Sequence, residues 1–308
     1  MTASLAVDVH GLQKNYGTTH ALRGLDLQVG TGTVAGFLGP NGAGKSTTIR
    51  ILLGLLRADG GNATLLGGDP WRDAVALHRR IAYVAGDVTL WPNLTGGQAI
   101  DILGALRGDH DRTRVDSFLQ RFDLDPTKKA RSYSKGNRQK VGLVSAFASR
   151  AELLFLDEPT NGLDPLMEEV FTECVKEARD EGRSVLLSSH IFAEVEKLCD
   201  TVTIIRDGRT VESGTLSELR HLQRSTVRVT LDADASALGA IDGVHDLVID
   251  GARATFTVDS AALPAVLAAL APLAPRELVS TPPSLEELFL RHYGVHASDA
   301  LMDAEVAS

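Results

Sequence analysis

Residues 39–47 are Gly39-Pro40-Asn41-Gly42-Ala43-Gly44-Lys45-Ser46-Thr47, and this stretch decides the fold of the chain. It matches the pattern G-x-x-x-x-G-K-[ST], in which backbone N–H groups and a lysine surround the phosphates of a nucleotide. Residues 33–38 predict a short buried strand before it, and apolar residues after the lysine recur at helical spacing. A strand, a glycine loop and a helix N-terminus in this order form an anion-binding site. The sequence therefore predicts a site for a nucleoside triphosphate.

The residues of this phosphate loop have separate predicted roles. Its three glycines let the backbone approach phosphate oxygens without a Cβ in the way. Lys45 is predicted to reach the β- and γ-phosphates, and the Ser46 hydroxyl is predicted to bind Mg²⁺. The alternative, a glycine-rich turn that contains a lysine by chance, does not explain the order of strand, loop and helix.

Length, charge and cysteine usage limit the class of protein. With 308 residues, the chain can form one domain of roughly 200 residues and a smaller one. The formal charge of −9 argues against a nucleic-acid partner, which normally requires a basic face. Cys174 and Cys199 lack the spacing of metal ligands, which favours buried thiols in a reducing compartment. No N-terminal signal and no membrane-spanning run are visible, so we expect a cytoplasmic protein that is soluble by itself.

The order of predicted elements indicates a mostly parallel sheet flanked by helices. The two N-terminal segments alternate in polarity and are expected to be half-buried antiparallel strands. A helical insertion is predicted for about residues 87–150, and a tight hairpin turn for residues 206–209. Strands are predicted at residues 6–12, 25–29, 33–38, 153–156, 184–188 and 202–205. The predicted nucleotide-binding domain spans about residues 1–220.

A second, smaller domain is predicted after a polar helical linker near residues 216–225. Its expected elements are strands at residues 227–231, 244–249 and 254–258, an amphipathic helix at 263–270 and a last strand near Leu278. Ser284 begins a capping-box pattern for a final helix. We expect an accessory α+β domain at residues 225–293 and a disordered tail at 294–308.

An apolar strand at residues 153–156 ends in two acids, Asp157 and Glu158. It brings Asp157 to the carboxyl edge of the sheet, where ligands bind in doubly wound folds, so Asp157 is predicted on the Mg²⁺ side of the phosphates. Glu158 is predicted to act as general base or to position the attacking water. The alternative is a core strand that ends in acidic surface residues, and the phosphate loop upstream disfavours it.

The segment Tyr133-Ser134-Lys135-Gly136-Asn137 precedes a helix with an apolar pattern. Taken alone, it fits a plain N-cap. Together with the flanking motifs it resembles the signature of the ATP-binding cassette family, in which Ser134 and Gly136 match and Lys135 and Asn137 depart. The resemblance covers about residues 5–216. It implies an α/β P-loop NTPase fold, with a RecA-like, mostly parallel core sheet, antiparallel N-terminal strands and a helical insertion, here followed by the small α+β domain.

The resemblance also implies a site that a second subunit completes. Residues 134–137 would contact the γ-phosphate of ATP held by the opposite subunit of an ATP-dependent, head-to-tail homodimer. Asp164 would lie in the loop that crosses the dimer interface. His190 resembles the switch histidine at the γ-phosphate, although a lone histidine at a strand end is more often structural. Tyr16 resembles the aromatic residue on which adenine stacks.

One position of the family pattern is not matched. Gly86 stands where the family has a glutamine that contacts the Mg²⁺ side and faces the transporter partner. Asp87, one residue later, is a candidate metal-side ligand in its place. Water is the alternative, and the sequence leaves both open.

The C-terminal part resembles the accessory domain of ATPase subunits from two-component exporters of the ABC-2, daunorubicin-resistance type. We therefore expect an Mg²⁺-dependent ATPase that energises a separate transmembrane permease and contacts the inner face of the cell membrane only through it. One alternative is a soluble cassette ATPase that acts on ribosomes or DNA, which would normally carry a second cassette or a basic arm. Another is a regulatory module that holds ATP without turnover, against which Lys45, Asp157, Glu158 and His190 count.

Overall fold

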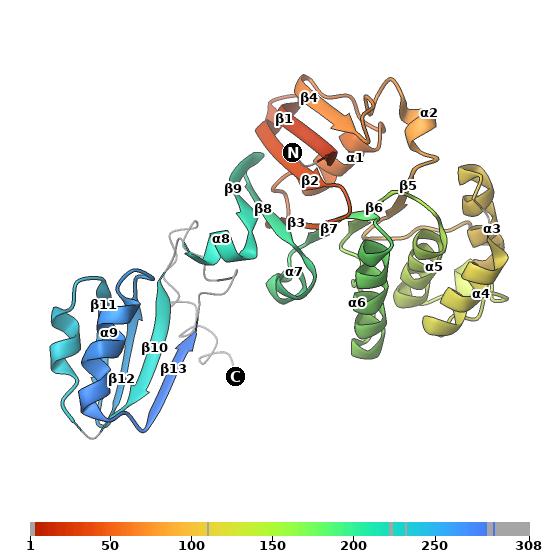
Figure 1. Ribbon diagram of the computed structural model, residues 1–308. Coiled ribbons are helices and arrows are strands. Elements are labelled where there is room, and N and C mark those ends of the chain that lie inside the picture. Colours follow the sequence, from red (N-terminus) through yellow and green to blue (C-terminus); the bar gives the residue numbers. More distant parts are fainter. Residues whose placement is uncertain (1–3, 110, 222–223, 232, 282–285, 287–308) are drawn as a thin grey trace. The chain divides into compact units, whose positions relative to one another are not determined.

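The computed structural model describes residues 4–109, 111–221, 224–231, 233–281 and 286 (Figure 1). The chain divides into two compact units, Met1–Gly214 and Thr215–Ser308. The first contains a six-stranded and a three-stranded sheet, and the second contains a four-stranded sheet. The capping box predicted at Ser284 and the tail predicted at 294–308 lie outside the described residues.

The six-stranded sheet has the strand order β5-β6-β7-β3-β8-β9. The first five strands in this order run parallel, as the sequence predicts. Asp207 and Gly208 join β8 to β9, and both have positive φ (49° and 75°), as a type I′ hairpin turn requires. The strands are β3 (Val34–Leu38), β5 (Ile81–Val84), β6 (Leu153–Asp157), β7 (Ser184–Ser189), β8 (Thr201–Arg206) and β9 (Arg209–Thr215).

The central strands β3, β6 and β7 are buried at every residue. Continuous apolar runs are typical of parallel strands that are covered on both faces. In Figure 1 the core strands lie between the N-terminal sheet with α1 (Lys45–Leu52) and the helices α5, α6 and α7. The latter are α5 (Lys135–Ala148), α6 (Pro165–Asp180) and α7 (Phe192–Leu198).

The N-terminal sheet is antiparallel, with the order β2-β1-β4. Its strands are β1 (Leu5–Tyr16), β2 (Thr19–Gly30) and β4 (Gly60–Leu65). One face of this sheet shares a hydrophobic core with Ile49 of α1 and Phe37 of β3. The sheet therefore covers the phosphate-loop side of the core.

Between β5 and β6 the structure is helical, apart from one isolated bridge. The elements are α3 (Gly96–Arg107), α4 (Arg112–Arg121), the short helix η1 (Ala130–Ser132) and α5. Phe147 of α5 stacks on Phe118 and Phe122, with ring centroids 6.0 and 6.3 Å apart, and meets Phe171 of α6 edge-on at 6.0 Å. These rings tie the helical insertion to the helices of the core. A short helix, α2 (Ala74–Leu77), lies before β5.

The second unit contains an antiparallel sheet with the order β11-β12-β10-β13. Its core joins alternate strand residues such as Val227 and Phe256 to Val266 and Leu270 of the helix α9. Its elements are α8 (Leu216–His221), β10 (Ser225–Thr230), η2 (Ser236–Ala240), β11 (Val244–Asp250), β12 (Arg253–Val258), α9 (Leu263–Leu270), η3 (Ala271–Leu273) and β13 (Glu277–Thr281). Within the described ranges, every helix is too short or too polar to cross a membrane.

The β8–β9 turn also holds the phosphate loop. The Gly208 N–H donates to the Ala43 carbonyl at 3.0 Å, and the Gly208 carbonyl accepts from the Arg23 N–H at 2.8 Å. A Cβ on Gly208 would lie 2.5 Å from the Ala21 carbonyl oxygen and 2.9 Å from the Leu22 Cα. Only glycine therefore fits between β2 and the phosphate loop.

We expect Gly208→Ala to lower both the free energy of unfolding and the affinity for ATP. The left-handed φ alone costs about 1 kcal/mol, and overlap with the β2 backbone adds about 2 kcal/mol. Gly182→Ala is the matched control, because Gly182 has a φ of 83° but an added Cβ would meet nothing within 4 Å. Urea denaturation measures both variants. Equal losses of stability in the two variants would show that the close contact between Gly208 and β2 has no effect on stability.

Candidate active site

The phosphate loop lies between β3 and α1 and borders a cavity of about 140 Å³. A Cβ on Gly39 would lie 2.5 Å from the Ile205 carbonyl oxygen, and one on Gly44 would lie 2.7 Å from Leu22 Cδ2. Close packing against β8 and β2 therefore favours glycine at both positions. This is a second reason for glycine, besides the close approach of phosphate predicted from the sequence. The cavity is lined by Ala21, Pro40, Asn41, Gly42, Gly44, Lys45, Ser46, Thr47 and Glu158.

The Lys45 side chain is buried inside the loop, with 5% of the residue exposed. Its Nζ donates to the carbonyl oxygens of Gly39 at 2.5 Å and Pro40 at 3.2 Å. Burial lowers the pKa of Lys45, while the charges of Glu158 and Asp157 raise it. The loop thus holds a partly desolvated cation next to two acids, which suits an anionic ligand.

Asp157 ends β6 and faces the first turn of α1. The Ser46 hydroxyl donates to one of its carboxylate oxygens at 3.5 Å, and the Ser188 hydroxyl donates to the other. Burial raises the pKa of Asp157, and the bond from Ser188 opposes this rise.

The donor set at Ser46 and Asp157 fits Mg²⁺. This ion takes one or two protein oxygens and completes an octahedron with water and phosphate. Among the described residues, no cluster of three or more His, Cys, Asp and Glu side chains is found, so the chemistry of a zinc site is not present there.

Glu158 follows Asp157 in a left-handed backbone conformation, with a φ of 46°. Its N–H donates to the Ser188 carbonyl at 2.9 Å. One carboxylate oxygen lies 3.3 Å from His190 Nδ1, and the other accepts from Asn161 Nδ2 at 2.8 Å. A non-glycine residue in this conformation persists where its surroundings fix it, as active sites often do. The structure therefore joins Glu158 and His190 and places Glu158 at the phosphate cavity.

Two polar contacts around these acids were missed by the sequence analysis. Neither Ser188 nor Asn161 was given a partner from the sequence. The pairing of β6 with β7 brings Ser188 to Asp157, and the turn after β6 brings Asn161 to Glu158. The Ser189 hydroxyl donates to Glu194 at 2.7 Å and accepts from the Ile191 N–H at 2.9 Å, which fixes the residues on both sides of His190.

The signature segment lies against the loop that contains Asp164. Ser134 caps α5 by accepting from the Asn137 N–H at 3.2 Å, and Asp164 caps α6 by accepting from the Met167 N–H at 3.0 Å. A Cβ on Gly136 would lie 2.3 Å from the Gly162 carbonyl oxygen. Residues 134–137 do not line the phosphate cavity.

The Lys135 stem also contacts this loop. A Cβ on Gly162 would lie 3.5 Å from Lys135 Cγ, which is ordinary van der Waals distance. The aliphatic part of Lys135 therefore covers Gly162.

Tyr16 and Asp87 are not joined to these groups. Tyr16 is 47% exposed and has the Lys14 ammonium 5.8 Å from its ring centroid. Asp87 is exposed and, in the part of the chain that the structure describes, its side chain makes no bond to Ser46 or Asp157. A Cβ on Gly86 would lie 3.2 Å from the Asp157 carbonyl oxygen, so a larger residue there would press on the end of β6. The metal role of Asp87 stays a prediction.

Comparisons with known proteins show what the chain is similar to. Residues 22–161 match the family model described as ABC transporter, and residues 214–293 match one described as the C-terminal domain of DrrA1-3-like ATP-binding proteins. The daunorubicin resistance ATP-binding protein DrrA3 of Streptomyces coeruleorubidus is 40% identical over 223 residues, which cover 71% of each protein.

Solved structures share the fold of the first unit. The structure of an ATP-binding subunit of an ABC transporter is 30% identical, with a TM-score of 0.67, over 70% of this chain and 92% of that one. A dimeric ATP-binding cassette bound to ADP and Pi is 22% identical, with a TM-score of 0.63, over 68% of this chain and 98% of that one. At this level of identity, the second likeness concerns the fold alone.

The buried charge of Asp157 predicts a pH-dependent cost in stability. Because its folded pKa is raised, its contribution to stability is present below the ordinary aspartate pKa and is lost as pH rises through the folded value. Without nucleotide and Mg²⁺, Asp157→Asn should therefore be more stable than wild type at neutral pH, by on the order of 1 kcal/mol. The difference in stability between the variant and wild type should shrink as pH falls. Denaturation at a series of pH values measures it, and a less stable Asn variant at neutral pH would contradict this account.

Proposed function

Because the chain belongs to the ATP-binding cassette (ABC) transporter family, we propose that two copies close around ATP and drive export through a separate transmembrane permease. The chain is an ATP-hydrolysing subunit of the drug-resistance exporter type. Our proposal adds three steps to this activity: dimer closure, Mg²⁺ binding and coupling to a permease. A drug or antibiotic is the proposed class of cargo.

One observation carries the dimer proposal. The phosphate cavity is bordered by the loop and Glu158, whereas Lys135 and Gly136 pack on Gly162 and residues 134–137 do not line the cavity. The N-terminus of α5 has backbone N–H groups and the Ser134 hydroxyl, which are the donors that a γ-phosphate requires. A second copy, placed head to tail, would supply them, and the same contact would bring Asp164 to the interface.

The residues of the site then have complementary roles. Loop N–H groups and Lys45 bind the phosphates, and Ser46 and Asp157 hold Mg²⁺, which neutralises charge on the β- and γ-phosphates. Glu158 orients a water for in-line attack and takes up its proton. His190, 3.3 Å from one Glu158 carboxylate oxygen, would help to hold that carboxylate in place and would contact the γ-phosphate. We retain Tyr16 as the residue on which adenine stacks and Asp87 as a metal-side ligand, directly or through water.

A groove of about 490 Å³ supports the permease proposal. It runs between α2 and β5 on one side and α3 on the other, and its apolar residues include Leu55, Val75 and Leu106, which are 64%, 80% and 73% exposed. Such exposed apolar side chains around a groove favour a protein partner. A short amphipathic helix of the permease is the occupant we propose, which would hold the subunit at the inner face of the membrane.

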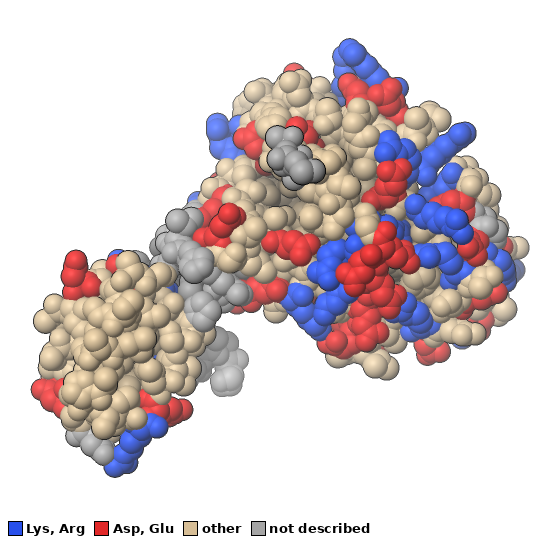
Figure 2. Space-filling view, viewed as in Figure 1, with Lys and Arg blue, Asp and Glu red and all other residues tan. Residues whose placement is uncertain are grey.

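A nucleic-acid partner is not supported. On the face drawn in Figure 2, Lys and Arg side chains are interspersed with Asp and Glu and do not gather into one basic surface. The accessory domain at residues 225–293 contains none of the proposed phosphate, metal or catalytic residues. We assign it to association between subunits or with the permease.

Glu158→Gln should bind ATP as tightly as wild type and lower turnover by about 100-fold or more. The glutamine amide can keep the hydrogen bond from Asn161 and the contact with His190, but it cannot accept a proton from water. Size-exclusion chromatography should show a dimer trapped by Mg²⁺ and ATP. Hydrolysis within a few-fold of wild type would remove Glu158 from the role of general base.

Two variants should separate the halves of the shared site. Lys45→Ala should lose ATP affinity in the isolated subunit, because its phosphates are bound by its own chain. Ser134→Arg should keep that affinity but block dimer formation and hydrolysis. Titration with a fluorescent ATP analogue measures binding, and an equal loss of affinity in both variants would contradict a site shared between subunits.

A further inference from the structure

The C-terminal end of α5 has one local donor, the Ser149 hydroxyl, which donates to the Ala146 carbonyl at 2.6 Å. The last four carbonyls of an α-helix have no partner within the helix and require donors from elsewhere. The last turn of α5 contains no basic residue, and the helix ends at the extended Ser149 without a left-handed cap. Because this end is buried, the donors that Ser149 does not supply must come from other parts of the protein.

Three arginines supply these donors. Arg107 donates to the Ser145 carbonyl at 2.8 Å, and Arg114 donates to the Phe147 carbonyl at 3.3 Å. Arg183 donates to the carbonyls of Ala146 and Phe147 at 3.1 and 3.2 Å. Cations at a helix C-terminus also interact favourably with the helix dipole.

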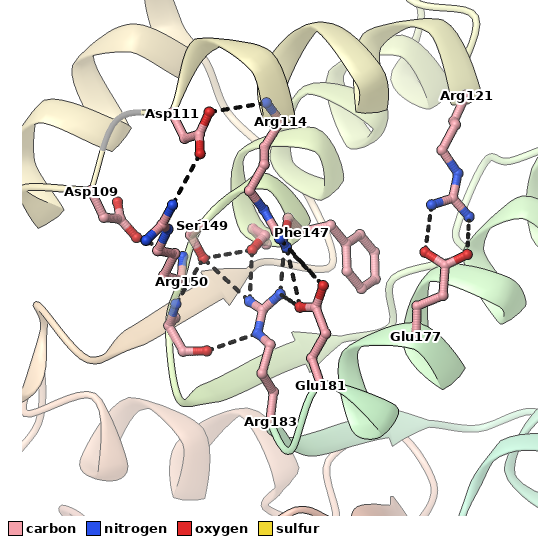
Figure 3. A network of polar contacts seen from close by, with 12 residues as sticks. Asp109, Asp111, Arg114, Arg121, Phe147, Ser149, Arg150, Glu177, Glu181 and Arg183 are labelled. Carbon is pink, nitrogen blue, oxygen red and sulfur yellow. Dashed lines mark hydrogen bonds and ion pairs between the residues drawn. The ribbon is translucent and has the colours of Figure 1, made fainter.

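Arg183 differs from the other two arginines in its position and its burial. Arg107 and Arg114 belong to the helical insertion, whereas Arg183 directly precedes strand β7 of the core sheet. It is 7% exposed, and it also donates to the Ala151 carbonyl at 2.8 Å and to the Ser149 hydroxyl. Figure 3 shows Arg183 and Arg114 converging on Phe147, with Glu181 beside both guanidinium groups. Of the three arginines, Arg183 is therefore the one that fastens α5 to the core.

The N-terminal end of α5 carries the signature segment, residues 134–137. The helix has 14 residues and is about 21 Å long, and it begins at the Ser134 cap. A helix is stiff over this length, so a shift or tilt at its C-terminal end changes the position of Ser134 and Gly136. Gly136 has little room to move, because it touches the Gly162 carbonyl.

We propose that Arg183 is a positioning residue for the signature, and that it acts through α5 on the ATP held by the partner subunit. The inference rests on the shared site proposed above. Arg183 does not line the phosphate cavity of its own chain. Loss of the Arg183 side chain should therefore leave the phosphate loop of its own chain intact. It should impair only the signature that the chain provides to the ATP of its partner.

The variant Arg183→Met keeps the length of the side chain and removes every donor, and Arg183→Lys keeps the charge and some donors. We expect Arg183→Met to lower ATP hydrolysis by about tenfold or more at saturating ATP, with less than about a twofold change in ATP affinity of the isolated subunit. Arg183→Lys should recover part of the activity, and it replaces the Met variant if that variant does not fold.

Arg121→Met is the matched control. Arg121 also joins the insertion to the core, because it binds both carboxylate oxygens of Glu177 in α6 at 2.6 and 2.9 Å. Within the described residues, it makes no bond to α5. This variant should lose some thermal stability but keep its hydrolysis rate.

Mixed dimers distinguish a defect in the signature from a defect in the fold. Arg183→Met mixed with Lys45→Ala should regain hydrolysis, because the first provides a phosphate loop and the second an intact signature. Arg183→Met mixed with Ser134→Ala should stay impaired, because neither provides an intact signature. The reverse pattern, or no recovery in either mixture, would overturn the proposal for Arg183.

A third mixture tests the underlying premise separately. Lys45→Ala mixed with Ser134→Ala, which removes the hydroxyl without adding bulk at the interface, should regain hydrolysis at one of its two sites. No recovery there would overturn the shared site, and the role of Arg183 with it. Recovery there, without recovery of Arg183→Met by Lys45→Ala, would overturn the role of Arg183 alone.

Discussion

The catalytic geometry depends on the parallel pairing of β6 with β7, in which Asp157 lies opposite Ser188. This register lets the Ser188 hydroxyl bind the Asp157 carboxylate and lets the Ser188 carbonyl accept from the Glu158 N–H. His190 then lies within reach of Glu158. A slip of one residue would turn Asp157 to the opposite face of the sheet and separate it from Ser46. One strand pairing thus fixes Asp157 and Glu158, the acids proposed for the metal side and the water side of the site.

The parts of the site that lie in continuous segments were predictable from the sequence. The phosphate loop follows a fixed spacing, and the apolar strands β3 and β6 lead directly to Gly39 and Asp157. Strand β4 was missed because Gly60, Gly61 and Asn62 have low strand propensity, and pairing with β1 determines its conformation. Long-range bonds, such as Ser188 to Asp157 or Arg183 to α5, leave no local pattern in the sequence. At Gly86 a Cβ would lie 3.2 Å from the Asp157 carbonyl oxygen, so a side chain there requires a small shift at the end of β6.

Helix α5 connects three surfaces that are important for the proposed cycle. Its N-terminus carries Ser134, Gln139 in its middle donates to the Ala85 carbonyl at 3.2 Å, and its C-terminus is bound by the three arginines. Arg107 also lines the apolar groove proposed for the permease. A partner in that groove would therefore act on the same helix that presents the signature. Such coupling requires the partner to bind the open and closed arrangements with different affinity.

In the proposed dimer, one chain cannot complete its own hydrolytic site. The most direct test is the rate of ATP hydrolysis per subunit, measured at saturating Mg²⁺ and ATP over a wide range of subunit concentration. A shared site predicts that the rate per subunit rises with concentration and then levels off as dimers form. A rate per subunit that is constant down to concentrations at which sedimentation shows only monomers would contradict the account.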